Sequence, residues 1–508
     1  MKATEDLFEL VQSLNKTEKR YFKQQSKLHV IGEKNNYLLL FDAIASQKKY
    51  DEAELLKQFH GANFIKRFAA AKHFLYRQVL KALRAYHRSI HSQTRDLIHE
   101  AEILYEKGLY GQSKKIIRKA KEIARKYEMQ WALLEIYRMW DVKLAFKKGG
   151  MDSLKKIMKE EENEFQLLEN TELYKNIELK MYMLYIMHGK EEKKRALTQM
   201  KKIMESKPMR NERTALTFES KLRFYNAHIY YMNEKGDAGQ CYVYAKKMID
   251  LYHSHPHKIH VDIAFYIIYL HNLIVASINE KKYREAATCL EAMERASLIA
   301  KTRSQKVACF YYYYYLLLGY YNRTGQFANA IETLVSFKKQ LEEFENGLNE
   351  LEKIVLFTNI AISYFGAGQY KQSNAWLNYI RNEIALTAHP DIDSMIKIFH
   401  LVVHYEAGNF DLLPYAIQST YRFLHKKERL YKFEMIIIDF LRNEIPKAAA
   451  QKDLIDAFKK LKIKMLPLEK DPYKKNALDS FDFISWLDSK IANRPFAEVV
   501  RGKAAIAK

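Results

Sequence analysis

Apolar residues recur at intervals of three and four through most of the chain, the spacing that keeps them on one face of an α-helix. Only 16 glycines and 8 prolines are spread over the 508 residues, and no proline precedes Pro208. Long periodic stretches therefore run without the residues that most often interrupt helices. The pattern predicts an all-α fold with no β-sheet.

A short motif divides these helical stretches. Gly325 is followed two residues later by Phe327 and then by Ala330, and the same spacing recurs from Gly368. Glycine permits a tight turn between two helices, the aromatic ring fills the angle between them, and the small residue lets the second helix approach the first. A third clear copy begins at Gly408, and four weaker copies begin at Gly108, Gly149, Gly236 and Lys281.

The motifs recur with a regular period. Their aromatic-type positions are 110, 151, 238, 283, 327, 370 and 410, which lie 40 to 45 residues apart except for one gap of 87 that spans a faint copy near Gly189. Eight helix–turn–helix units fit this series. The units resemble tetratricopeptide repeats in their glycine, aromatic and small positions, although their period exceeds the 34 residues of that family and is nearer the 40–47 of HEAT and armadillo repeats.

This resemblance implies an α-solenoid, a right-handed superhelix of about eight helix pairs whose first helices line a concave face. Side chains on that face would hold an extended peptide or a partner helix by stacking and by hydrogen bonds to its backbone. The predicted groove residues are Asn226, Tyr230, His271, Tyr312, Tyr315, Arg323 and Tyr405. Within the run Tyr311–Tyr315, five consecutive side chains cannot all face one way, so some must pack between helices.

We expect three parts in the chain: an N-terminal helical bundle (1–93), the repeats (94–440) and a C-terminal capping segment (441–508). Pro467 and Pro472 indicate a linker before the aromatic stretch around Trp486. That stretch predicts a capping helix that covers the end of the last repeat. The tail after Arg494 is expected to fray.

The net charge of +23 is concentrated near the ends, with an excess of 11 positive charges in residues 1–130. No acidic residue lies between Glu54 and Asp96. A helix expected over Asn63–His91 would carry one apolar face, which includes Phe68, Leu75 and Val79, opposite one basic face. The residues of this basic ridge are His73, Arg77, Lys81, Arg84 and Arg88.

Two interpretations of the basic ridge remain open. In the first interpretation the ridge has no partner outside the chain, and acidic side chains of neighbouring helices pair with its charges. Alternatively, the ridge would bind nucleic acid, an acidic protein or a lipid head group. The absence of acidic residues one turn away on the same helix favours the second interpretation without choosing between the partners.

No motif indicates an enzyme, a metal or a cofactor. The histidines at 253, 255, 257 and 260 surround Pro256 in a turn between repeats, and His400 and His404 lack the glutamate of zinc-protease helices. The glycines of Gly366-Ala367-Gly368 indicate a turn instead of a dinucleotide loop. The three cysteines show no paired spacing, which suits a reducing compartment and predicts a cytoplasmic protein. The apolar stretch 263–278 is too short for a membrane span.

The sequence therefore predicts a non-enzymatic scaffold that binds a protein or peptide in the concave groove of its repeats. The alternative is a nucleic-acid-associated regulatory protein that contacts phosphates through the basic N-terminal helix, a hypothesis that draws on analogy with tetratricopeptide-type regulators. Neither hypothesis identifies the partner.

Overall fold

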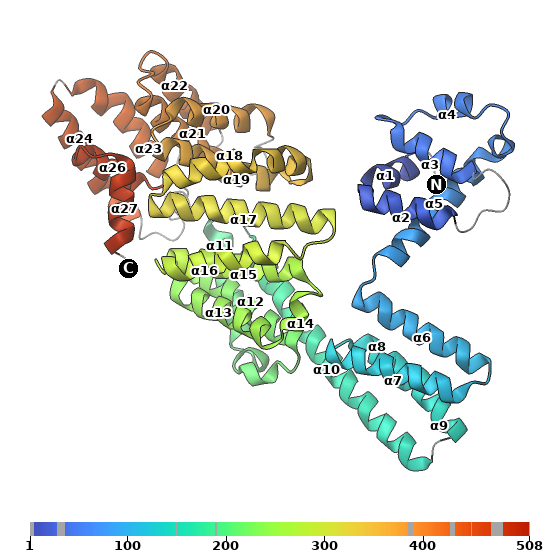
Figure 1. Cartoon of the computed structure of the whole chain (residues 1–508). Helices are drawn as coiled ribbons and strands as arrows, with labels where there is room; N and C mark the ends of the chain where they lie inside the picture. The colour runs from blue at the N-terminus through green and yellow to red at the C-terminus, as the bar shows by residue number, and fades with distance from the viewer. Residues whose placement is uncertain are drawn as a thin grey trace. The chain divides into compact units, whose positions relative to one another are not determined.

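A computed structural model describes residues 5–27, 36–148, 150–187, 190–384, 390–426, 432–448, 450–468 and 481–506. The chain divides into two compact units, Met1–Glu162 and Asn163–Lys508, each of which is described by itself (Figure 1). All regular structure in the described residues is helical, which confirms the all-α prediction. The division into three parts remains a prediction.

The first unit begins with a bundle whose core is formed by α1, α2, α3 and α5, around Leu40, Phe41, Leu75 and Val79. In chain order, the helices of the first unit are α1 (Asp6–Ser13), α2 (Lys16–Lys27), α3 (Asn36–Ser46), α4 (Glu52–Gln58), the short 3-10 helix η1 (Asn63–Arg67), α5 (Phe68–Tyr86), α6 (Ile90–Glu106), α7 (Tyr110–Lys126), α8 (Gln130–Glu135), the π-helical η2 (Ile136–Asp141) and α9 (Val142–Lys148).

Helix α10 (Met151–Tyr185) runs from the first unit into the second. The second unit continues with α11 (Lys190–Met204), η3 (Lys207–Met209), η4 (Glu212–Thr214), α12 (Phe218–Lys235), α13 (Ala238–Ser254), α14 (Pro256–Ile259), α15 (Ile263–Asn279), α16 (Tyr283–Ser297), α17 (Arg303–Thr324), α18 (Phe327–Phe344), η5 (Glu345–Gly347), α19 (Glu350–Gly366), α20 (Tyr370–Glu383), α21 (Pro390–Glu406), α22 (Leu413–Lys426), α23 (Lys432–Asp439), the π-helical η7 (Phe440–Glu444), η8 (Ile445–Lys447), α24 (Gln451–Met465), η9 (Leu466–Leu468), α26 (Phe483–Ile491) and α27 (Phe496–Ile506).

The predicted turns at Gly325, Gly368 and Gly408 are present, and all three glycines have φ near +70°. The N–H of the following residue donates to the carbonyl five residues earlier, as from Gln326 to Tyr321 at 2.9 Å. This is the hydrogen bond of a Schellman cap, which satisfies a carbonyl at the end of the first helix. The glycine-less copy forms the same turn, because Lys281 takes the left-handed conformation with φ of 58°.

Small residues let the paired helices approach each other, as the motif predicted. Ala330 is fully buried in the pair α17–α18. Ser373 in α20 is also fully buried, and its hydroxyl donates to the carbonyl of Ala361 in α19 at 2.8 Å. First helices also pack on one another: α17 lies between α15 and α19, so one long helix contributes to both buried clusters of the second unit (Figure 1).

The chain end differs from the expectation. Residues 496–506 form α27 instead of a frayed tail, and Val500 and Ala504 are buried. Phe496 at its start packs on Phe327 and Phe365, with ring centroids 5.6 and 5.5 Å away. The prediction of fraying was wrong because an amphipathic helix finds an apolar surface far away in the sequence, which local composition does not reveal.

Two glycines with nearly the same left-handed φ, 72° at Gly325 and 73° at Gly368, provide a matched test of this docking. A Cβ atom at Gly325 would lie 2.7 Å from the backbone nitrogen of Arg501, whereas a Cβ at Gly368 would meet nothing within 4 Å. We expect Gly368→Ala to lower the free energy of unfolding by about 1–2 kcal/mol, the cost of a left-handed alanine. Gly325→Ala should cost roughly 1–3 kcal/mol more, because α27 must also shift.

Urea unfolding of the two variants, monitored by circular dichroism, measures this difference. Equal losses for both variants would show that α27 does not rest on the α17–α18 turn.

Candidate functional site

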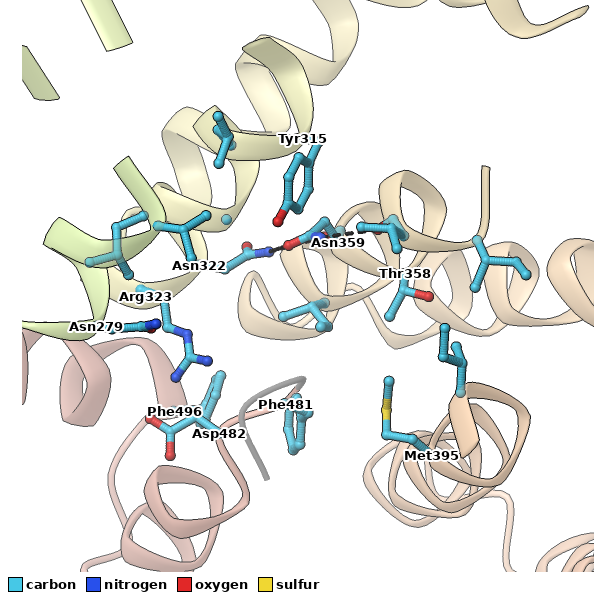
Figure 2. Close-up of a pocket in the computed structure, with 18 residues that line it drawn as sticks. Asn279, Tyr315, Asn322, Arg323, Thr358, Asn359, Met395, Phe481, Asp482 and Phe496 are labelled. Atoms are coloured by element: carbon cyan, nitrogen blue, oxygen red, sulfur yellow. Dashed lines mark hydrogen bonds between the residues drawn. The ribbon is translucent and has the colours of Figure 1, made fainter. Parts of the chain in front are cut away.

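The second unit contains a cavity of about 370 Å³. Its walls come from the successive first helices α15, α17, α19 and α21 and from the beginnings of the two C-terminal helices (Figure 2). Aliphatic side chains such as Ile354 and Met395 and the rings of Phe481 and Phe496 form much of the lining. The cavity is thus mainly apolar, with a limited set of polar groups, as is common for ligand sites.

Two asparagines form a polar wall across α17 and α19. The Asn322 amide donates to the carbonyl of Asn359 at 3.1 Å, and the hydroxyl of Ser363 donates to the Asn322 side-chain oxygen at 2.8 Å. The Asn359 amide donates to the carbonyl of Val355 at 3.0 Å. These bonds fix the orientation of both amides beside the cavity. Figure 2 shows the two side chains meeting between the helices.

Thr358 adds a hydroxyl to the lining of the cavity. The residue is 6% exposed, and its Oγ1 has no hydrogen-bond partner among the described residues. A buried hydroxyl without a partner costs about 1–3 kcal/mol. A ligand that occupied the cavity with a polar group near Thr358 would remove this cost.

Opposite charges lie at the boundary between α17 and the C-terminal segment. Arg323 and Asp482 both line the cavity, and both influence the neighbouring phenol of Tyr283 electrostatically. Asp482 also caps α26, since its carboxylate accepts a hydrogen bond from the N–H of Ser485 at 2.8 Å. The cavity therefore offers a cation and an anion together with amides and the hydroxyls of Thr358 and Tyr315.

The tyrosine run beside the cavity packs between helices: Tyr311 is buried, and the other four tyrosines are half-buried. Tyr311 is buried and stacks on Tyr315 with centroids 5.5 Å apart, and Tyr315 lines the cavity. The His271 ring lies 5.3 and 5.7 Å from the rings of Tyr312 and Tyr315. Burial lowers the pKa of His271 to about 4 and raises the pKa of Tyr315 to about 12. Both side chains are thus neutral at physiological pH.

The structure brings only some of the predicted groove residues together. Tyr315 and Arg323 line the cavity, and Tyr312 and His271 adjoin it. Asn226 is buried elsewhere, where its amide donates to Glu178 at 2.5 Å and to Tyr230 at 3.1 Å. Both residues therefore belong to a separate polar cluster of α10 and α12.

The seventh predicted groove residue, Tyr405, packs against chain elements from the C-terminal segment. Its ring lies 6.1 Å from Phe458 and 6.3 Å from Trp486. Trp486 is fully buried and donates its indole N–H to Glu406 at 2.7 Å. The end of α21 is thus covered by α24 and α26.

Sequence reasoning missed Asn322, Thr358 and Asn359. A signal was available for the two asparagines, because they stand in the first helices, α17 and α19, of two consecutive helix pairs. No signal in the sequence placed Phe481, Asp482 and Phe496 in the cavity.

The basic ridge is shorter than predicted. Helix α5 ends at Tyr86, so the predicted continuation to His91 was wrong and Arg88 lies in the connection to α6. Ser89 caps α6 by accepting a hydrogen bond from the N–H of Ser92 at 3.0 Å, which explains the break. All five ridge residues, from His73 to Arg88, are exposed, and none forms an ion pair with another described residue.

Lys72 on the same helix behaves differently. It is 4% exposed and its ammonium donates to Glu52 at 2.5 Å and to Tyr50 at 3.2 Å. The hydrogen bond from Lys72 lowers the pKa of Glu52. The buried Lys72 therefore forms its ion pair with the half-buried Glu52 on the core side of α5, away from the ridge.

In the part of the chain that the structure describes, no three His, Cys, Asp or Glu side chains are grouped so that they could hold a metal ion. His400 instead lies between Arg381 and Asn374, at 3.0 and 2.6 Å. None of the described helices is long and apolar enough to cross a membrane. No protein-family model, curated protein or solved structure matches the chain.

The lowered pKa of His271 predicts a pH dependence of stability. An unfolded histidine titrates near 6.5, so between pH 6.5 and about 4 the unfolded chain binds a proton that the folded chain does not. Stability should therefore fall as the pH is lowered through this window, by at most about 3 kcal/mol from this residue.

His271→Phe keeps a ring between the tyrosines and should reduce this loss, as measured by urea unfolding at pH 7, 6, 5 and 4.5. The exposed His260→Phe is the matched control. If both variants follow the wild-type pH profile, His271 is not held neutral by its surroundings.

Proposed function

We propose that this chain is a non-enzymatic scaffold of the cytoplasm that binds a short segment of a peptide or protein in the cavity of its second unit. The observation that carries the proposal is the polar wall of Asn322, Asn359 and Thr358 opposite an apolar lining. Amide and hydroxyl groups match the alternating donors and acceptors of an extended backbone, and the apolar wall receives its side chains.

The architecture in this proposal is a right-handed solenoid of about eight tetratricopeptide-like helix pairs, closed by a C-terminal cap. The shared Schellman turn supports it, since it recurs in α6–α7, α12–α13, α15–α16, α17–α18, α19–α20 and α21–α22. The adjacency of α15, α17 and α19 supports it too, because first helices of consecutive pairs pack together in such arrays.

The C-terminal segment sets the size of the ligand in this proposal. Phe481, Asp482 and Phe496 form one wall of the cavity, and α26 covers the end of α21. A space of about 370 Å³ receives a few residues of an extended chain and no helix. The ligand is therefore a short segment instead of a long one laid along the whole array.

The chemistry of the lining supports binding without catalysis. Its polar groups are amides, hydroxyls, a guanidinium and one carboxylate that already caps a helix. Amides do not exchange protons at neutral pH, and the arginine stays charged, so the wall suits recognition more than acid–base chemistry.

Thr358→Val tests the proposal, because it removes the unpartnered hydroxyl and keeps the shape of the side chain. Peptides selected from a random seven-residue phage library on the full chain would be measured by calorimetry. We expect binding to weaken about 5- to 30-fold, which corresponds to one lost hydrogen bond of about 1–2 kcal/mol. The melting temperature should stay equal or rise, since a buried unsatisfied group is lost.

Ser277→Ala is the matched control. Ser277 is fully buried and its hydroxyl also lacks a partner among the described residues, but it does not line the cavity. Peptide affinity should be unchanged in this variant. Selected peptides that bind wild type and Thr358→Val equally would place their site elsewhere and defeat the proposal.

A further inference from the structure

We propose that the first unit binds single-stranded nucleic acid on a surface that combines three cations of α5 with an exposed pair of aromatic rings. The surface consists of Tyr37, Phe74, Arg77, Lys81 and Arg84, and we call it the strand-binding face. It lies outside the cavity of the second unit and does not depend on the function proposed for that cavity.

The cations of this face are available for a partner. Arg77, Lys81 and Arg84 are exposed, and none of them forms an ion pair within the described residues. Arg84 follows Arg77 by seven positions, which corresponds to about 10 Å along a helix. A single strand whose backbone follows this stretch of α5 can therefore place two or three phosphates within reach of the three side chains.

The aromatic pair is the feature that selects the partner. Phe74 and Tyr37 are 42% and 37% exposed, and their rings meet at 4.4 Å between α5 and α3. Phe74 precedes Arg77 by three residues and Lys81 by seven, so helix geometry places all three on neighbouring parts of one surface. Large rings that are exposed beside cations are typical of surfaces on which unpaired bases stack.

Other anionic partners fit this combination less well. An acidic protein would use the cations, but its carboxylates gain nothing from the aromatic rings, whose faces carry partial negative charge. In a duplex the bases stack on one another inside the helix, so surface rings cannot reach their faces. A single strand uses both features at once, with phosphates on the cations and bases on the rings.

The charge contribution is tested by fluorescence anisotropy with the full chain and a labelled 15-residue oligothymidylate, in 50 to 300 mM KCl. Arg77→Gln, Lys81→Gln and Arg84→Gln combined should weaken binding at least 10-fold at 100 mM KCl. The slope of log affinity against log salt should fall by about 2, at roughly 0.7 per lost phosphate contact on a single strand.

A charge-matched control separates this face from net charge. Lys114, Lys115 and Arg118 on α7 are also exposed and lie in the same unit. Their combined replacement by Gln removes the same charge and should change the affinity less than 3-fold. An equal loss in both triple variants would overturn the proposal in favour of general electrostatic attraction.

The stacking contribution is tested by Phe74→Leu, which keeps an apolar side chain and removes the aromatic face. We expect at least a 5-fold loss of affinity for the oligothymidylate with the salt slope unchanged, and thermal unfolding of the variant checks that it folds. A 15-base-pair duplex and a 15-residue polyglutamate peptide should bind at least 10-fold more weakly than the single strand. The proposal would be overturned if the duplex or the polyglutamate peptide bound as tightly as the oligothymidylate. It would also be overturned if Phe74→Leu folded and bound the oligothymidylate as tightly as wild type.

Discussion

The contact between Phe327 and Gly366 determines how the central helix pairs of the second unit fit together. A Cβ atom at Gly366 would lie 2.1 Å from a ring carbon of Phe327, so only a glycine backbone leaves room for the ring. The same ring stacks on Phe496 of α27 at 5.6 Å. One side chain thus joins α17–α18, α19–α20 and the C-terminal segment. The cavity and its asparagine wall lie between these elements, so their geometry depends on this contact.

The two proposed surfaces operate under different physical conditions. In the cavity, hydrogen bonds form away from water, where an unmatched group such as the Thr358 hydroxyl is costly and selects its ligand by geometry. On the strand-binding face, exposed charges act through a screened field, and stacking supplies the discrimination. Salt should therefore weaken binding at the strand-binding face and leave binding in the cavity nearly unaffected. A salt series thus distinguishes the two surfaces.

The sequence predicted those features that depend on local chemistry. A Schellman turn involves residues only five apart, so its glycine and its small partner are visible in the sequence, as at Gly325 and Ala330. Two of the predicted groove residues, Tyr315 and Arg323, line the cavity, because both stand on α17, which forms one of its walls. The end of α5 was predicted too late, since neither glycine nor proline marks it and only the capping side chain of Ser89 signals the break.

Long-range docking could not be predicted in the same way. Arg501 donates to the carbonyl of Gly325, 176 residues away, and no periodicity connects the two. This contact has a thermodynamic consequence for the cavity. Because Phe481, Asp482 and Phe496 form one of its walls, a ligand in the cavity touches both the helix pairs and the C-terminal segment. Binding energy gained from that wall is gained only when the segment is docked. The two effects are linked thermodynamically. The free energy by which docking of the segment strengthens ligand binding equals the free energy by which the bound ligand stabilises the docked segment.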